Sequence, residues 1–219
     1  INAGLNAYIT ITGDEALAAA KKAEKAVTNG DELGALHGVP VSIKDLEVTE
    51  GTRTTFGSIV FKDHIPNEDS LVVERMRRSG AIILGKTNTP EFGLSGTTEN
   101  LLGDSCRNPW DSERTSGGSS GGAAVSLATG LCSLASGSDG GGSIRIPSSF
   151  CGVFGIKPSQ WRVPRYGGVR AANPPANQFS QSGPMARTVR DAAILLQVLS
   201  GPDRRDPIVP RDCVPDFVS

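Results

Sequence analysis

The distribution of polar and apolar positions predicts helices in three regions of the chain. Residues 13–30 begin with acidic side chains, continue with Ala and Lys, and end at an Asn-Gly pair, which is typical of a surface helix. Residues 68–80 carry acid at the start and Arg at the end, before a glycine that stops the helix. Residues 188–201 contain Thr188 and Asp191 at the spacing of a capping box, and we expect the final helix there.

Short apolar runs predict the strands of a sheet. They lie at 39–43, 81–85, 131–136 and 153–158, and a helix of small residues is expected at 121–130. Strands and helices therefore alternate along the chain. That order predicts an α/β fold in which a mostly parallel, mixed and twisted sheet is covered by helices.

The composition narrows the class of protein. The chain has 219 residues, enough for one sizeable core, and its 22 Lys and Arg balance 23 Asp and Glu, which gives no reason to expect nucleic acid or a membrane as a partner. No apolar run approaches the roughly 20 residues of a membrane-spanning helix. The four cysteines form no CxxC pair, so we expect free thiols in a reducing compartment, the cytoplasm. With only two histidines in the chain, neither a metal site nor an organic cofactor is implied.

Two clusters of glycine and serine are the candidates for chemistry. GGSSGG, residues 117–122, matches G-x-S-x-G at Ser119 and again at Ser120, but an α/β-hydrolase would need a later histidine and none follows. A phosphate-binding loop would need a lysine in the cluster. SDGGGS, residues 138–143, runs three glycines into Ser143. Small residues leave that hydroxyl open and let several backbone amides point to one spot, as acyl transfer requires.

A nucleophilic Ser143 would need a proton acceptor other than histidine, because His37 and His64 lie far upstream and His37 is expected in a solvated turn. Lys44 ends the apolar strand VPVSI. Burial there would disfavour its charged form and bring its pKa well below the usual value of about 10.4, so that activity would rise with pH. The alternative is a charged lysine at a strand end that faces water.

The spacing of the two clusters allows them to meet. A helix over 121–129 would span about 14 Å, and a strand over 131–135 would span about 17 Å in the opposite direction. The chain would then return close to where it started. Both serines can therefore lie at the carboxyl edge of the sheet, where α/β proteins place their sites.

Four segments resemble blocks of the amidase signature family, in the same order along the chain. They are HGVPVSIKDLEVTEGTRTTFGS at 37–58, AIILGKTNTPEFG at 81–93, CRNPWDSERTSGGSSGG at 106–122, and the long block from 117 to 159. The similarity extends from about Leu5 to Asp206. It implies the amidase signature fold, with residues 1–219 as its N-terminal and catalytic-motif portion, and we expect that sheet to be incomplete in this chain.

The resemblance also implies the roles of single residues. Lys44 would be the general base, Ser119 a relay serine after a cis peptide bond, and Ser143 the nucleophile. The amides of Gly140, Gly141, Gly142 and Ser143 would form the oxyanion hole.

Further residues of the motifs have two interpretations each. Asp139 and Arg145 would brace the loop that carries the nucleophile, or form an ordinary surface ion pair. Ser120 would be a second relay or, more simply, a helix N-cap. Residues 96–100, GTTEN, would lie near the substrate pocket or form a polar loop.

The implied function is hydrolysis of a small-molecule amide through an acyl-enzyme on Ser143, without metal or cofactor, in a possible homodimer. One alternative is the amidase (A) subunit of a tRNA-dependent amidotransferase, which releases ammonia from glutamine, although SDGGGS and LLGDSCRNPW look more like general amidases. Others are a truncated, non-catalytic scaffold and a site that binds an anion without chemistry.

Two departures from the family pattern lead to further expectations. Trp161 stands where the family usually carries a glycine, and a large residue could strain that turn. Family members continue well beyond this length, and the tail from 201 to 219 has no clear pattern and is expected to be a connector. We therefore expect residues 1–219 alone to be poorly soluble or partly disordered, with an unpaired sheet edge and weak or no amide hydrolysis.

Overall fold

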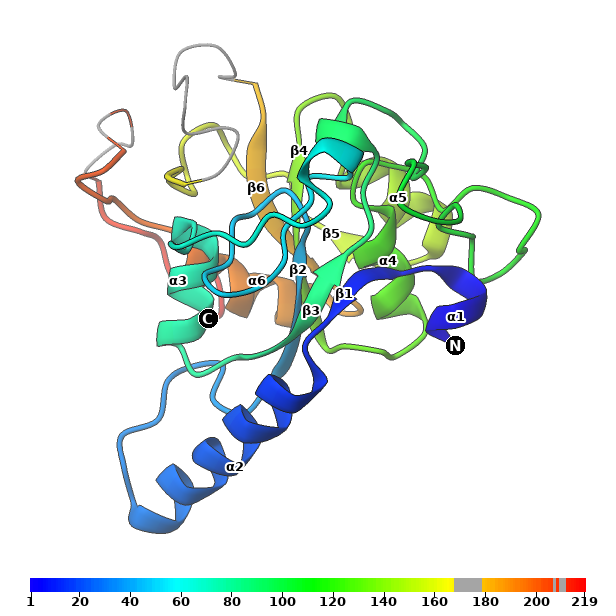
Figure 1. Ribbon diagram of the computed structural model, residues 1–219. Coiled ribbons are helices and arrows are strands. Elements are labelled where there is room, and N and C mark those ends of the chain that lie inside the picture. The colour runs from blue at the N-terminus through cyan, green and yellow to red at the C-terminus, as the bar shows by residue number, and fades with distance from the viewer. Residues whose placement is uncertain (168–178, 207, 209–211) are drawn as a thin grey trace.

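A single sheet forms the centre of the protein in a computed structural model that describes residues 1–167, 179–206, 208 and 212–219. Within these residues the strand order is β1-β3-β2-β4-β6-β5 (Figure 1). The strands are β1 (Tyr8–Ile11), β2 (Pro40–Lys44), β3 (Ile82–Thr87), β4 (Leu134–Asp139), β5 (Phe154–Gly155) and β6 (Gln181–Ala186). The helices are α1 (Asn2–Leu5), α2 (Gly13–Asn29), α3 (Leu71–Arg78), α4 (Gly121–Ala128), α5 (Arg145–Cys151) and α6 (Val189–Leu199), with 3-10 turns at Ile59–Phe61 and Glu91–Gly93.

The fold class is confirmed as a mixed sheet covered by helices, but parallel pairs are not the majority. β2 runs parallel to both β3 and β4, whereas β1, β5 and β6 form antiparallel pairs with their neighbours. The difference arises because the sequence pattern does not predict β1 and β6. β6 contains Gly183 and Pro184, residues that normally indicate a turn or an edge rather than a strand between two others.

Most predicted helices are present, and one is new. α2 and α6 match their predictions closely, and Thr188 Oγ1 accepts the Asp191 amide at 3.1 Å as the N-cap of α6. The pattern does not predict α5, because Pro147 lies inside it; proline is nevertheless tolerated in the first turn, where its missing N–H has no helical partner. The helix ends at Gly152, whose φ of 70° is a common C-terminal signal.

Apolar side chains cover both faces of the sheet. On one face, α3 and α6 pack against β2, and on the other, α4 and α5 pack against β4 and β6 (Figure 1). The first core cluster includes Val41, Ile43, Val73, Met76, Leu195 and Leu199. The second includes Ala123, Val125, Leu127, Ala135, Ile144 and Met185.

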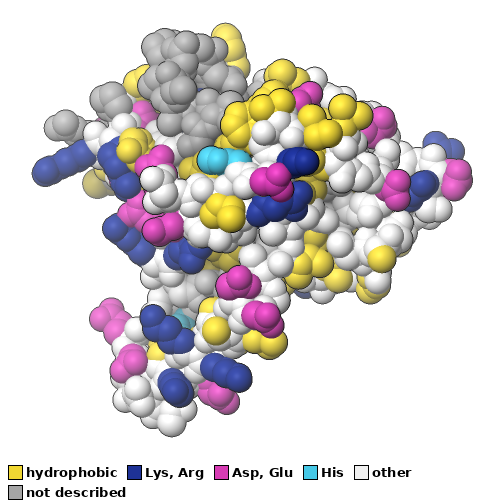
Figure 2. Space-filling model, in the orientation of Figure 1, with side chains coloured by type: hydrophobic (Ala, Val, Ile, Leu, Met, Phe, Trp, Pro, Cys, Tyr) yellow, Lys and Arg dark blue, Asp and Glu magenta, His cyan; other side chains and the backbone are white. Residues whose placement is uncertain are grey.

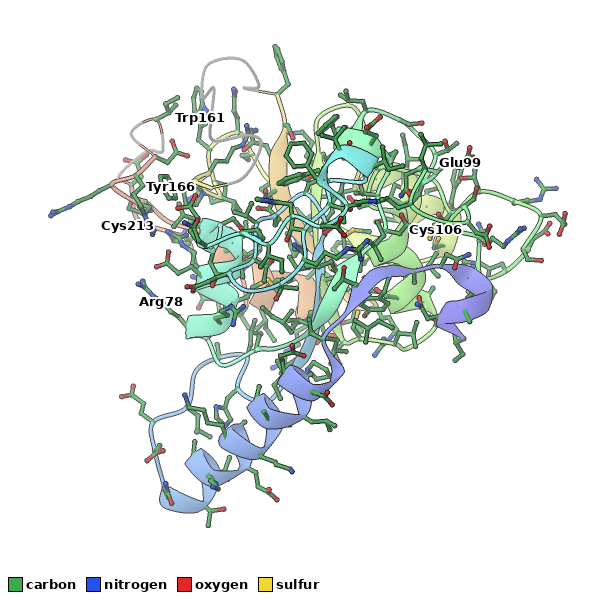
Figure 3. The ribbon with its side chains drawn as sticks, in the orientation of Figure 1. Arg78, Glu99, Cys106, Trp161, Tyr166 and Cys213 are labelled. Carbon is green, nitrogen blue, oxygen red and sulfur yellow. The ribbon has the colours of Figure 1, made fainter. Side chains whose placement is uncertain are left out.

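Two expectations about single residues are confirmed. Trp161 has a positive φ of 64°, the left-handed conformation that favours glycine, and its amide donates to Gln181 Oε1 at 3.0 Å. Figure 3 labels its ring at the same end of the molecule as Tyr166. All four cysteines are free thiols. Among the helices that the structure describes, none combines the length and apolar character needed to cross a bilayer.

Candidate active site

Lys44 is the centre of the candidate site, at the carboxyl end of β2. Its side chain is fully buried, so the alternative of a lysine facing water is wrong. Its Nζ lies 2.7 Å from Ser119 Oγ, 2.8 Å from Ser120 Oγ and 3.1 Å from Ser138 Oγ. Hydroxyl oxygens from two different segments therefore surround one buried amine.

The first glycine-serine cluster presents Ser119 and Ser120 to Lys44. The peptide bond between Gly118 and Ser119 is cis. Ser120 is the N-cap residue of α4, as the simpler interpretation had it, but its side chain makes no capping hydrogen bond and contacts Lys44 instead. A Cβ at Gly118 would lie 2.5 Å from the carbonyl oxygen of Thr97, so the backbone approach requires glycine.

The segment GTTEN packs against this cluster. Thr98 Oγ1 donates to the carbonyl oxygen of Gly117 at 2.7 Å. A Cβ at Gly121 would lie 2.3 Å from Thr98 Oγ1, so α4 begins in direct contact with the segment. Residues 96–100 are thus part of the wall behind the serines, and not a loop apart from them.

Ser143 comes to the same place from the second cluster. It follows the end of β4, and its carbonyl oxygen accepts the Ser120 amide at 3.1 Å. This hydrogen bond ties the two clusters together at the carboxyl edge of the sheet, as their spacing predicted. Ser143 is partly exposed, whereas Lys44 and Ser119 are fully buried. The three residues therefore run from the protein interior towards its surface.

Asp139 and Arg145 hold the loop that carries Ser143. Two bonds join the guanidinium of Arg145 to the buried Asp139 carboxylate, at 2.9 and 3.0 Å. The amides of Gly142 and Ile144 donate to the same carboxylate at 2.7 and 3.2 Å. Burial would raise the pKa of Asp139, but the hydrogen bonds from Arg145 and from these amides outweigh it and bring the pKa to about 2.

The backbone amides of the loop are used unequally. The Gly142 amide points to Asp139 Oδ1, so in this structure it does not face a site where an oxyanion would form. Gly142 has a φ of 121°, which orients this amide and which other residues rarely adopt. The predicted place of Gly142 in an oxyanion hole therefore needs correction. Gly140 and Gly141 are exposed at the turn, and their part in such a hole stays a prediction.

Ser138 is a site residue that the sequence interpretation missed. Ser136 and Ser138 alternate along β4 and so share one face. Ser136 Oγ accepts the Lys44 amide at 3.0 Å, and Ser138 Oγ lies next to Lys44 Nζ. Hydroxyls at alternate positions of a buried strand were the available signal.

The histidines take no part in the site. His37 Nε2 lies 3.0 Å from the carbonyl oxygen of Ala23 in α2, and the ring of His64 packs against Phe56 and Phe61. In the part of the chain that the structure describes, His, Cys, Asp and Glu side chains form no group of three suited to a metal ion.

Comparisons with known proteins agree with this geometry. The family model for amidases matches residues 1–218. A curated relative, the (A) subunit of glutamyl-tRNA(Gln) amidotransferase from Carboxydothermus hydrogenoformans, is 45% identical over 215 residues, which are 98% of this chain and 44% of that protein. A bacterial aryl acylamidase structure has a TM-score of 0.90 at 40% identity, covering 99% of this chain and 44% of its own. The peptide amidase of Stenotrophomonas maltophilia has a TM-score of 0.88 at 35% identity, covering 98% and 44%. The chain thus spans less than half the length of these proteins.

Proposed function

The chain belongs to the amidase signature family, and from that premise we propose that it carries the acyl-transfer site of an amide hydrolase. Ser143 is the nucleophile, Ser119 the proton relay and Lys44 the general base. The observation that carries the proposal is the 2.7 Å contact between the buried Lys44 Nζ and Ser119 Oγ. A base and a relay at hydrogen-bond distance, beside a partly exposed serine, form the arrangement that covalent catalysis needs.

In the proposed reaction, Ser143 Oγ attacks the amide carbonyl carbon. Its proton passes to Ser119 Oγ, and the Ser119 proton passes to the neutral amine of Lys44. The C–N bond then breaks, the amine leaves with a proton returned along the same path, and an ester to Ser143 remains. Water attacks this ester in the reverse sequence and releases the acid.

The environment of Lys44 supports its role as a base. Removal from water disfavours the ammonium form of a lysine. The hydroxyls of Ser119, Ser120 and Ser138 can each accept a hydrogen bond from the amine or donate one to it. A neutral Lys44 can therefore accept a hydrogen bond from Ser119 while the other two hydroxyls keep it in place.

We place the oxyanion beside the amides of Gly140, Gly141 and Ser143. Gly142 is left out, because its amide donates to Asp139. The fixed orientation of the loop supports this proposal, since preorganised donors cost no rearrangement when charge develops on the carbonyl oxygen. Asp139 and Arg145 provide that orientation from behind the turn.

A second candidate is an amidase subunit that releases ammonia from glutamine for a partner. The name of the 45% identical curated relative favours it. Turnover of glutamine and of a simple anilide by the full-length protein separates the two. An anilide hydrolase indifferent to glutamine supports the general amidase, and the opposite result supports the amidotransferase component. For both candidates we propose the cytoplasm, where the free thiols would persist.

Labelling with a fluorophosphonate tests the nucleophile. Ser143→Ala should abolish labelling, because the probe forms its bond with that oxygen. Ser149→Ala, which changes an exposed serine six residues further on in α5, should label as the wild type does. Ser120→Ala should be slower but still labelled. Labelling that persists in Ser143→Ala and is lost in Ser120→Ala would contradict the assignment.

A further inference from the structure

A second fully buried lysine has no part in the proposed reaction. Lys86 is in β3, and its Nζ donates to the carbonyl oxygen of Glu47 at 2.5 Å and to Thr54 Oγ1 at 2.7 Å. It also lies 3.7 Å from Asp45 Oδ1. A buried ammonium with this set of partners joins two separate segments, the turn after β2 and the loop around residue 54.

Asp45 is the residue directly after Lys44, and it is equally buried. Its Oδ1 faces Lys86, while its Oδ2 accepts the Thr55 amide at 3.0 Å and the Thr55 hydroxyl at 2.5 Å. The carboxylate is therefore held by the same two segments that Lys86 joins. Burying two opposite charges is costly unless they are paired and hydrogen-bonded, and this pair has both kinds of support.

Lys86 and Lys44 lie on opposite faces of the sheet. Lys86 is the partner of Ile43, and Thr87 is the partner of Lys44. Successive side chains of a strand point to opposite faces, so Lys86 lies on the face of Ile43 and away from Lys44 Nζ. An influence of Lys86 on the position of the Lys44 amine can therefore pass through the backbone of β2.

The backbone around Lys44 offers that path. The Asp45 amide donates to the Thr87 carbonyl at 3.2 Å, and the Asp45 carbonyl accepts the Phe56 amide at 3.1 Å. The Glu47 amide donates back to the Lys44 carbonyl at 3.0 Å, which closes a turn whose Glu47 carbonyl is bound by Lys86. The turn that ends β2 is therefore held from both sides.

We propose that Lys86 and Asp45 are positioning residues, which fix the end of β2 and thereby keep Lys44 Nζ within reach of Ser119. The inference rests on the proposed function for its catalytic consequence. Its structural part, the clamp on residues 44–56, stands independently of that function.

The test uses the double variant Lys86→Met/Asp45→Asn in the full-length protein, because removal of both charges leaves no unpaired charge in the interior. Lys62→Met, an exposed lysine, is the matched control. Hydrogen exchange measured by mass spectrometry should be at least tenfold faster over residues 44–56 of the double variant, and unchanged over α6. The rate of fluorophosphonate labelling at Ser143 should fall at least tenfold, while Lys62→Met matches the wild type in both measurements.

The two measurements separate failure of the inference from failure of the proposed function. Wild-type exchange over residues 44–56 in the double variant overturns the clamp, and so does faster exchange spread evenly over α6 as well, which indicates a general loss of stability. Faster local exchange with unchanged labelling overturns the positioning role. If the wild-type protein is not labelled at Ser143, the proposed function fails, and the exchange result alone decides whether the clamp exists.

Discussion

Asp139 illustrates how a single side chain can organise a functional loop. Its carboxylate is buried, yet it accepts two bonds from Arg145 and further bonds from backbone amides of the turn around Ser143. A charged acceptor strengthens each of these bonds. The loop of small residues, which would otherwise be flexible, is thereby fixed at the end of β4.

The charge of Asp139 should appear in the dependence of stability on pH. A pKa of about 2, lowered from an ordinary value of 3.8, means that the folded state favours the carboxylate. The contribution is about 2 kcal/mol. It is fully present above pH 3.8 and is lost as the pH falls towards 2. Asp139→Asn should therefore be about 2 kcal/mol less stable than the wild type at pH 7, with a difference that shrinks below about pH 4.

Urea unfolding between pH 7 and pH 2.5 measures this difference. Asp31→Asn, at an exposed carboxylate, is the control and should change the free energy of unfolding little at any pH. A difference for Asp139→Asn that stays constant down to pH 2.5 would mean that its carboxylate charge is not what stabilises the loop.

Among the secondary-structure elements, α4 fits its neighbours most closely. It is made of small residues, and every residue from Gly121 to Leu127 is buried. A Cβ at Gly122 would lie 2.3 Å from the Asn88 amide nitrogen and 2.4 Å from the Ala7 carbonyl oxygen. These are backbone atoms, which cannot rotate away. Small residues therefore let α4 approach the end of β3 and bring Ser119 to Lys44.

Adding one methyl group at this contact should destabilise the protein. We expect Gly122→Ala to lower the free energy of unfolding by about 1–3 kcal/mol, because the helix must shift away from β3. Gly13→Ala at the start of α2 meets no atom within 4 Å and should leave stability unchanged or slightly higher. Thermal and urea unfolding of both variants provide the test, and equal stabilities would show that α4 has room to move.

At the scale of the whole molecule, apolar surface is divided between two buried clusters and an exposed region. Figure 2 shows hydrophobic side chains gathered over the upper part of the molecule. Leu94 and Leu101 are 85% and 82% exposed, in contrast to Leu195, which is fully buried between α6 and the sheet. Exposed apolar side chains in one region promote association.

Polar replacement of the exposed leucines should affect solubility and leave the fold intact. Leu94→Gln/Leu101→Gln should reduce light scattering by the 219-residue chain, with a change in the free energy of unfolding within about 0.5 kcal/mol. Leu195→Ala should instead cost about 2–5 kcal/mol, because it opens a cavity in the core. Scattering that is unaffected by the double replacement would place the source of association elsewhere, such as a sheet edge at β1 or β5.

Several features of the protein could be derived from its sequence. Local patterns were sufficient for α2, α3, α6 and the three parallel strands, because each has a strong apolar period or a clear end signal. The spacing of the two glycine-serine clusters placed them at one edge of the sheet, which the bond between Ser120 and Ser143 confirms. The motifs also singled out Lys44, Ser119 and Ser143, whose catalytic roles stay predictions.

Other features depend on contacts between segments far apart in the chain. No local pattern distinguishes a buried Lys44 from an exposed one, since burial is supplied by Ser119, Ser120 and Ser138 from other elements. The direction of the Gly142 amide depends on where the Asp139 carboxylate lies. Lys86 and Asp45 are far apart in the sequence, and only the parallel pairing of β2 and β3 brings them together. The sequence therefore determined which groups are present, and tertiary structure decided their burial, direction and partners.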